Sequence, residues 1–373
     1  MSNPVLTSAM LIEATGAALN NAGADEGQRT DNAVVVKKIR VGRAEFPYVS
    51  GQAVRRWWRE VLYEDFGWQP SPVTREAKSA YTSGEPVNYP DDDMFGYMAA
   101  KKVKGQARSQ KKDSATTDAA TGDETSEGSK EKGDTGTQRR ISPLKNSLLV
   151  SVLPNAVTSD FGHFSRDLPV DNPNMVPFEH EHYTTFLQGV FTISLRDVGR
   201  FECGLMRDLP LDAPVPEGGR VLHEAQGNLQ PRVLSLSPAE RRKRVADTIL
   251  ALGRLRHGAN LTRNLSDVVP VVLLMGFLDG GNAPFQRLFT SHDTSHVELD
   301  LERLRSVVGD YKDRILGDHT LYFGYRPGVL ANEAQVKEAL SSGIDGVSFV
   351  VESPGGVIRI VAEHINAGRV ELD

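Results

Sequence analysis

The sequence predicts a mixed α+β fold, built round an antiparallel β-sheet with longer excursions inserted between its strands. Two observations support this prediction. Runs rich in β-branched residues alternate with segments whose apolar residues recur at helical spacing, a mixture typical of an α+β architecture. No internal repeat of about 20 to 50 residues is visible, which excludes a solenoid.

The composition indicates a soluble globular protein of one large or two ordinary domains. The chain has 373 residues, 39% of them hydrophobic and 25% charged, and no apolar run approaches the roughly 20 residues that span a bilayer. The net charge of −6 argues against nonspecific nucleic-acid binding, so any anion site must be a local patch. The N-terminus lacks a secretory signal, and the single cysteine, Cys203, favours a reducing cytoplasm.

The first half of the chain contains four well-marked elements. Residues 5–13 form a strand-like run, and residues 49–66 form a helix-like run that Ser50 can cap. Residues 147–153 and 189–195 are β-rich and flank a long intervening segment.

The second half opens with the strongest helix signals. Ser237 can cap a helix over residues 238–257, Pro238 suits its first position, and Glu240 completes a capping box. Pro270 indicates an edge position or a late start for the next strand. The further expected elements are strands at 268–278, 320–325, 347–351 and 357–362, and helices at 301–316 and 333–340.

Residues 101–140 differ in composition from the rest of the chain. They contain no aromatic residue and one large aliphatic residue, Val103. Such a segment buries too little apolar surface to offset the entropy of ordering it, so we expect it to be disordered. It is either a solvated surface loop or a basic-ended arm that touches nucleic acid.

The helix expected at 49–66 carries one apolar stripe and one arginine-rich face. Val54, Trp57, Trp58, Val61 and Leu62 share the stripe, which favours core packing of the tryptophans over base stacking. Away from the stripe, Arg56 can pair with Glu60. Arg55 and Arg59 are four apart and repel, so an external anion explains them better than the fold does, although they could be ordinary surface arginines.

Two further basic regions can contribute to the same kind of site. Upstream, a polar loop leads into Lys37, Lys38 and Arg40, and strand alternation puts Lys38 and Arg40 on one face. Downstream, residues 241–244 (RRKR) are consecutive and are expected to be mostly solvated. The residues at the tail of that helix either bind a ligand or are cations that the helix dipole favours at a C-terminus. The candidates for ligand binding are Arg256, His257, Asn260 and Arg263.

The segment between the strands near 150 and 190 is proline-rich and apolar. Its exposed apolar side chains are expected either to dock on the parent domain or to touch a partner. The residues concerned are Phe161, Phe164, Met175 and Phe178. His180 and His182 allow a metal site, but no second ligand pair stands at the usual spacing, so we expect no metal and no cofactor. The chain also lacks phosphate-loop, dinucleotide, HExxH and GxSxG motifs, so we expect no catalysis.

Taken together, four segments resemble a known family. LNNAG, TDNAVVVKKIR, YVSGQAVRRWWRE and NLTRNLSDVVP are similar to the DevR-type branch of the Cas-seven backbone subunits of type I CRISPR surveillance (Cascade) complexes, most of all type I-B. The resemblance covers roughly residues 1–100 and 141–280.

The resemblance implies a subunit whose palm is an elaborated RRM-like (ferredoxin-like) antiparallel sheet, with an inserted finger region and a thumb hairpin. On this scheme residues 1–66 begin the palm, 67–146 form a finger-type insertion, 147–157 add a palm strand, 158–188 form the thumb, and 189–373 complete the palm. The thumb would interrupt the guide–target duplex with a wedge residue, for which the candidates are Phe161, Phe164 and Met175.

The resemblance also implies the partners: CRISPR RNA, the target DNA strand paired to it, further copies of the chain head to tail, and other Cascade subunits. Family positions that contact RNA phosphates match Asn20, Asn21, Ser50, Gln52, Arg55 and Arg59. The last two replace lysine-type positions, and arginine can bind phosphate with two parallel hydrogen bonds.

Two other functions remain open. Relatives in type III complexes cut target RNA with an aspartate in the loop after the first strand, where this chain has Asp25 and Asp31. A host regulatory protein is the third possibility, because the DevR name comes from a developmental role.

Overall fold

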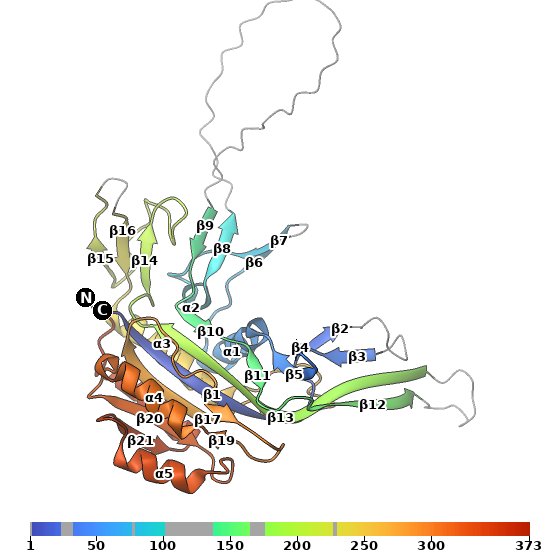
Figure 1. Ribbon diagram of the computed structural model, residues 1–373. Coiled ribbons are helices and arrows are strands. Elements are labelled where there is room, and N and C mark those ends of the chain that lie inside the picture. The colour runs from blue at the N-terminus through green and yellow to red at the C-terminus, as the bar shows by residue number, and fades with distance from the viewer. Residues whose placement is uncertain (1, 24–32, 77–78, 101–136, 165–175, 227–229) are drawn as a thin grey trace, which may run out of the picture.

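In the computed structural model, a large central sheet runs through the molecule and small hairpins stand on it (Figure 1). The structure describes residues 2–23, 33–76, 79–100, 137–164, 176–226 and 230–373. Within them the sheet has 12 strands, and its main path runs in the order β21 (Ser348–Glu352), β20 (Thr320–Tyr325), β17 (Pro270–Asp279), β1 (Pro4–Ala17), β13 (Val176–Ser194), β11 (Leu149–Ser151), β5 (Ala44–Val49) and β4 (Lys38–Val41).

The sheet is mostly antiparallel, as predicted. β1 pairs antiparallel with β13 and with β17. Among the strands of this sheet that the structure describes, parallel pairing occurs only between β20 and β21 and between β13 and β3. Further strands join the path at β13 or β3: β2 (Asn21–Gly23), β3 (Ala33–Val36), β10 (Leu144–Asn146) and β12 (Val157–Phe164). The α+β prediction is therefore confirmed at this level.

Each face of the sheet carries its own core, because strand side chains alternate. Leu6 and Met10 of β1 belong to one buried cluster, with α1 (Gly51–Phe66), α3 (Pro238–Ala251), η1 (Leu252–Arg254) and α6 (Pro354–Asn366). Ala9 and Leu11 belong to the other, with β18 (Phe289–Thr290), β19 (Glu298–Leu299), α4 (Leu301–Tyr311) and α5 (Glu333–Ser342); η2 (Lys312–Arg314) follows α4.

Smaller elements project from the sheet on one side in Figure 1. They are the hairpin of β6 (Val73–Glu76) and β7 (Ser79–Thr82), helix α2 (Pro90–Phe95), the hairpin of β8 (Tyr97–Ala100) and β9 (Thr137–Arg140), and a three-stranded sheet of β14 (Arg200–Cys203), β16 (Arg232–Ser235) and β15 (Arg220–His223). The β12–β13 hairpin extends in another direction (Figure 1).

Two local predictions need correction, and one alternative is decided. Residues 137–140, which we expected to be disordered, form β9, and Arg140 is 6% exposed; residues 101–136 lie outside the described part of the chain. Residues 357–362, expected as a strand, lie inside α6, which Ser353 caps and Pro354 begins. Of the two alternatives for Pro270, the late strand start is confirmed, since β17 begins at Pro270 and lies between β1 and β20.

The basic run 241–244 is not mostly solvated, which is a third correction. Arg241 and Arg244 are 2% and 3% exposed. Arg241 donates to the carbonyl of Val198 and pairs with Asp373, whereas Arg244 pairs with Asp93 at 2.7 Å. These two side chains therefore hold the fold together and are not free to bind a ligand.

None of the helices formed by the described residues is both long and apolar enough to cross a membrane.

Candidate functional site

The N-terminus of α1 is the centre of the candidate site. The Ser50 hydroxyl accepts a hydrogen bond from the Ala53 amide at 3.3 Å, which confirms Ser50 as the cap. The Ser50 amide donates to Asn20 Oδ1 at 2.9 Å, so it is not available to an anion. The amides of Gly51 and Gln52 belong to the first turn and have no acceptor within the helix. Together with the helix dipole, they make this end a place where an anion is stabilised.

Residues 19–21 lie beside this helix end and contact both residues 259–260 and Lys37. Asn260 Nδ2 donates to Asn21 Oδ1 at 3.2 Å, and the Ala259 amide donates to the carbonyl of Leu19 at 3.1 Å. The Lys37 amide donates to the Asn20 carbonyl at 3.0 Å. The fold thus brings Asn20, Asn21, Lys37, Ser50, Gln52 and Asn260 into one region, although they span most of the chain.

The buried stripe of α1 is as predicted. Its members are Val54, Trp57, Trp58, Val61 and Leu62. Trp58 donates to the Thr248 carbonyl at 2.7 Å and meets Phe191 edge to face, with ring centroids 5.2 Å apart. The tryptophans therefore pack in the core and are not stacking platforms for bases.

Arg55 has a structural task that the sequence did not reveal. Its guanidinium donates to the carbonyls of Leu144 at 2.8 Å and Phe95 at 2.5 Å, and to Ser142 Oγ at 3.0 Å. Burial, and then the positive charge of Arg59, lower the pKa of Arg55 to about 10. The argument that the fold leaves Arg55 without a partner is wrong.

Arg59 is held differently. Its guanidinium lies over the ring of Phe95, with Cζ 4.3 Å from the ring centroid. Among the described residues it forms no hydrogen bond or ion pair. Arg56, by contrast, is 77% exposed and pairs with Glu60 at 2.7 Å, as predicted. Arg59 is therefore the cation on this helix that keeps its hydrogen-bond donors available.

Carboxylate or imidazole partners hold four of the other basic candidates: Lys38, Arg40, Arg256 and Arg263. Lys38 pairs with Glu181 at 2.7 Å, and Arg40 pairs with Glu45 at 2.7 Å. Glu45 also contacts Lys38 at 3.6 Å, which places Lys38 and Arg40 on one face as expected. The Arg40 hydrogen bond is the main reason why the pKa of Glu45 is lowered.

Arg256 and Arg263 lie apart from the start of α1. Arg256 pairs with Glu64 at 2.6 Å and Asp65 at 2.7 Å, near the C-terminal end of the helix. Arg263 donates to His180 Nε2 at 2.7 Å, at the base of the β12–β13 hairpin. Burial, and then the charge of Arg263, lower the pKa of His180.

The β12–β13 hairpin is more regular than its prolines suggested, with eight residue pairs from Val157–Tyr183 to Phe164–Val176. Phe161 is 49% exposed. The side chain of Phe164 and all of Met175 lie outside the described residues, as do Asp25 and Asp31. No group of three or more metal-binding side chains occurs in the described part of the chain.

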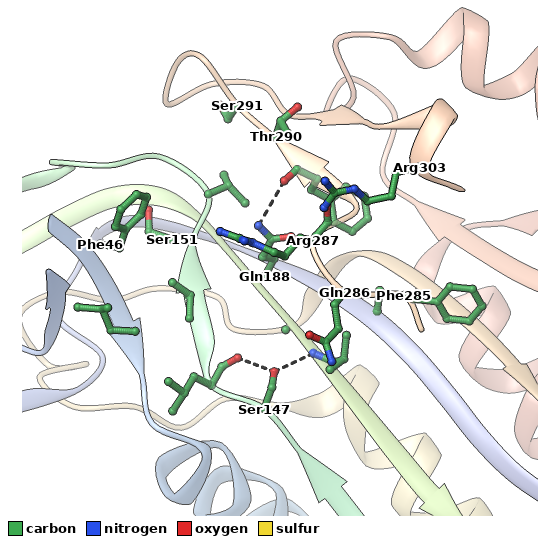
Figure 2. A pocket seen from close by; sticks show the side chains of 18 of the residues that line it. Phe46, Ser147, Ser151, Gln188, Phe285, Gln286, Arg287, Thr290, Ser291 and Arg303 are labelled. Carbon is green, nitrogen blue, oxygen red and sulfur yellow. Dashed lines mark hydrogen bonds between the residues drawn. The ribbon is translucent and has the colours of Figure 1, made fainter. Parts of the chain in front are cut away.

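A groove of about 740 Å³ lies on the sheet face opposite α1 and was not predicted. Its floor includes Ala9 and Val190, and its lining contains two arginines and no carboxylate. Figure 2 shows Arg287 and Arg303 beside Gln188, with Phe46 on the far side. The lining comes from six separate segments, none of which has a motif, so no local signal could have revealed the groove.

Comparison with known proteins supplies a family context. A family model described as "CRISPR-associated negative auto-regulator DevR/Csa2" matches residues 10–293. A chain of a solved structure described as "CRISPR RNA-guided surveillance complex, pre-nicking" has the same fold at 10% identity, with a TM-score of 0.50 and coverage of 96% of this chain and 99% of that one. A second, "CRISPR RNA-guided surveillance complex", has 11% identity, a TM-score of 0.48 and coverage of 96% and 98%. No curated protein matches.

Proposed function

Because the chain belongs to the CRISPR-associated DevR/Csa2 family, we propose that it is a non-catalytic backbone subunit of a type I Cascade surveillance complex, of subtype I-B. In this role it binds the spacer of a CRISPR RNA and presents it for pairing with target DNA. The observation that carries the proposal is the polar helix end of α1, with Arg59 left without a hydrogen bond or ion pair among the described residues.

The guide backbone would pass the start of α1. The Gly51 and Gln52 amides, the Gln52 side chain and Arg59 are donors for phosphate oxygens. Asn20, Asn21, Lys37 and Asn260 lie beside them. Such contacts read no base edges, so one subunit accepts any spacer, and base pairing supplies the sequence specificity.

Arg55 contributes to this interface indirectly, by holding α1 against α2 and β10. Lys38, Arg40, Arg256 and Arg263 have partners in the chain, so they contribute positive potential more than direct contacts. The proposed phosphate site therefore contains fewer basic side chains than the sequence suggested.

The rest of the assignment follows the family scheme. The central sheet is the RRM-like palm (1–66, 147–157 and 189–373), residues 67–146 are the fingers, and residues 158–188 are the thumb. Phe161, exposed on β12, is the described residue that can act as a wedge between bases; Phe164 and Met175 are the other candidates. Further copies of the chain would stack head to tail on one another. Other Cascade subunits would complete the complex, which would lie in the cytoplasm.

The test is co-purification of nucleic acid. The protein is expressed with its neighbouring genes and a CRISPR array, and bound RNA is extracted and sequenced. We expect spacer-containing RNA with the wild type and little with Arg59→Glu, because the reversed charge repels phosphate. Arg56→Glu is the matched control, since it makes the same change on the exposed side of the same helix. Guide RNA at wild-type stoichiometry with Arg59→Glu would show that the interface is misplaced.

A second measurement separates this role from RNA cleavage. The assembled complex is incubated with RNA complementary to the guide and Mg²⁺. We expect the RNA to remain intact. Cleavage that disappears in Asp31→Ala would instead assign an aspartate-dependent ribonuclease.

A further inference from the structure

We propose that Phe95 is a positioning residue for the RNA interface: its ring fixes the guanidinium of Arg59 in the orientation that meets phosphate. The inference rests on the proposed function and adds a residue that is in none of the four quoted segments, although the family model covers it. Phe95 is the last residue of α2 and is 4% exposed. The ring lies 4.3 Å from Arg59 Cζ and 5.1 Å from Arg55 Cζ, so two cations share one aromatic ring.

The first step is electrostatic. Arg55 and Arg59 are one helical turn apart and repel each other. Arg55 is fixed, because its donors are bound to Leu144, Ser142 and the carbonyl of Phe95 itself. An aromatic face attracts cations, so the ring offsets part of the repulsion and keeps Arg59 close. Without the ring, Arg59 is free to swing away from Arg55.

The second step concerns hydrogen-bond donors. A carboxylate that held Arg59 would occupy its N–H groups and neutralise its charge. The ring uses none of these N–H groups, so the edge of the guanidinium stays available for two parallel bonds to phosphate. The nearby carboxyl of Asp91 accepts from the Tyr63 hydroxyl at 2.6 Å, and burial is the main cause that raises its pKa. The charge of Arg59 acts on Asp91 in the opposite direction and lowers its pKa, but the two side chains form no hydrogen bond or ion pair, so Asp91 leaves the N–H groups of Arg59 unoccupied.

The third step is entropic. A free arginine side chain loses rotamer freedom when it binds, and that loss weakens affinity. A guanidinium already stacked on a buried ring has lost part of that freedom before RNA arrives. Phe95 thus strengthens a contact that it does not itself make.

The test is a double-mutant cycle on the full chain with a fluorescein-labelled single-stranded RNA of mixed sequence, measured by anisotropy over a series of salt concentrations. Phe95→Leu removes the ring and is expected to weaken binding about 3- to 10-fold. Phe95→Tyr keeps the ring and should bind within about two-fold of the wild type. Phe66→Leu is the matched control, because Phe66 lies under Arg254 at the other end of α1, 5.5 Å from Cζ.

The cycle distinguishes positioning from general destabilisation. In an Arg59→Gln background, Phe95→Leu should have no further effect on affinity. Arg59→Gln itself should reduce the slope of log K against log salt concentration by about 1, which is the change expected when one phosphate contact is lost. Melting temperatures are recorded for every variant, and Phe95→Met replaces Phe95→Leu if leucine prevents folding.

Two results would overturn the positioning role of Phe95 and leave the proposed function intact. One is equal weakening by Phe95→Leu with and without Arg59, and the other is wild-type binding by Phe95→Leu while Arg59→Gln binds weakly. If Arg59→Gln changes neither the affinity nor the slope, the proposed phosphate contact itself is wrong, and the positioning role fails with it.

Discussion

The three arginines of α1 show how identical side chains receive different tasks from their surroundings. Arg56 is exposed and pairs with Glu60 on its own helix. Arg55 is largely enclosed and binds backbone carbonyls of two other segments. Arg59 lies on a ring with its donors unused among the described residues. Spacing along the helix does not separate these tasks, since each depends on what lies opposite the side chain.

At this scale we predict that Arg55→Met lowers the free energy of unfolding by on the order of 3 kcal/mol, because it removes the guanidinium from the Phe95 carbonyl and leaves the Leu144 carbonyl with the Ser142 hydroxyl as its side-chain donor. Arg56→Met should cost about 0.5 kcal/mol or less, as is usual for an exposed pair. Chemical denaturation followed by circular dichroism measures both. Equal effects of the two substitutions would contradict the structural role given to Arg55.

At the scale of elements, α2 connects the small hairpins to the main body. Its first turn holds three consecutive aspartates that are each 5% exposed or less. Asp91 binds Tyr63 of α1 at 2.6 Å, and Asp92 accepts from Ser71 at 2.8 Å. Asp93 pairs with both Arg140 of β9 and Arg244 of α3. One short helix thus ties α1, α3 and the β8–β9 hairpin together.

We predict that Asp93→Asn costs about 3 to 5 kcal/mol of stability, since it removes the negative charge between two buried arginines. Asp212→Asn makes the same chemical change on an exposed loop and should cost about 0.5 kcal/mol or less. Urea denaturation compares the two. If the Asp93 variant is as stable as the Asp212 variant, Asp208 and Glu240 suffice to balance the arginines.

At the scale of the whole molecule, the fold presents different surfaces in different directions. The β12–β13 hairpin extends one way, while α4 and α5 cover the sheet at the other end (Figure 1). The groove with Arg287 and Arg303 lies on the sheet face opposite α1. Contacts between copies that use unlike surfaces give a closed ring or an open filament, and in the proposed function they give a filament whose length something else must set.

On the proposed function, the guide sets that length. We predict that lengthening the spacer of the CRISPR RNA adds copies of the chain to the complex, in steps, because each copy covers a fixed length of RNA backbone. Native mass spectrometry of complexes assembled on a series of spacers measures the copy number. A constant copy number across the series would show that protein contacts alone fix the size.

The local signals in the sequence were sufficient for α1, its cap and its buried stripe, and for the start of α3, because caps and helical periodicity depend on residues close in the chain. The strand predicted at 357–362 failed because the window was too short. Over Pro354–Asn366 the buried residues recur at helical spacing and Ser353 supplies the cap. That error could have been avoided from the sequence.

The tasks of the buried arginines could not be derived in this way. Arg55 meets Leu144 across 89 residues, and Arg244 meets Asp93 across 151. The convergence of Asn21 with Asn260, the ring of Phe95 under Arg59 and the unpredicted groove are likewise contacts between distant segments. A charged side chain is free or committed according to the partners that folding brings to it. The sequence therefore determined which residues could bind an anion, and the tertiary structure decided that Arg59 keeps its donors available and that Arg55 does not.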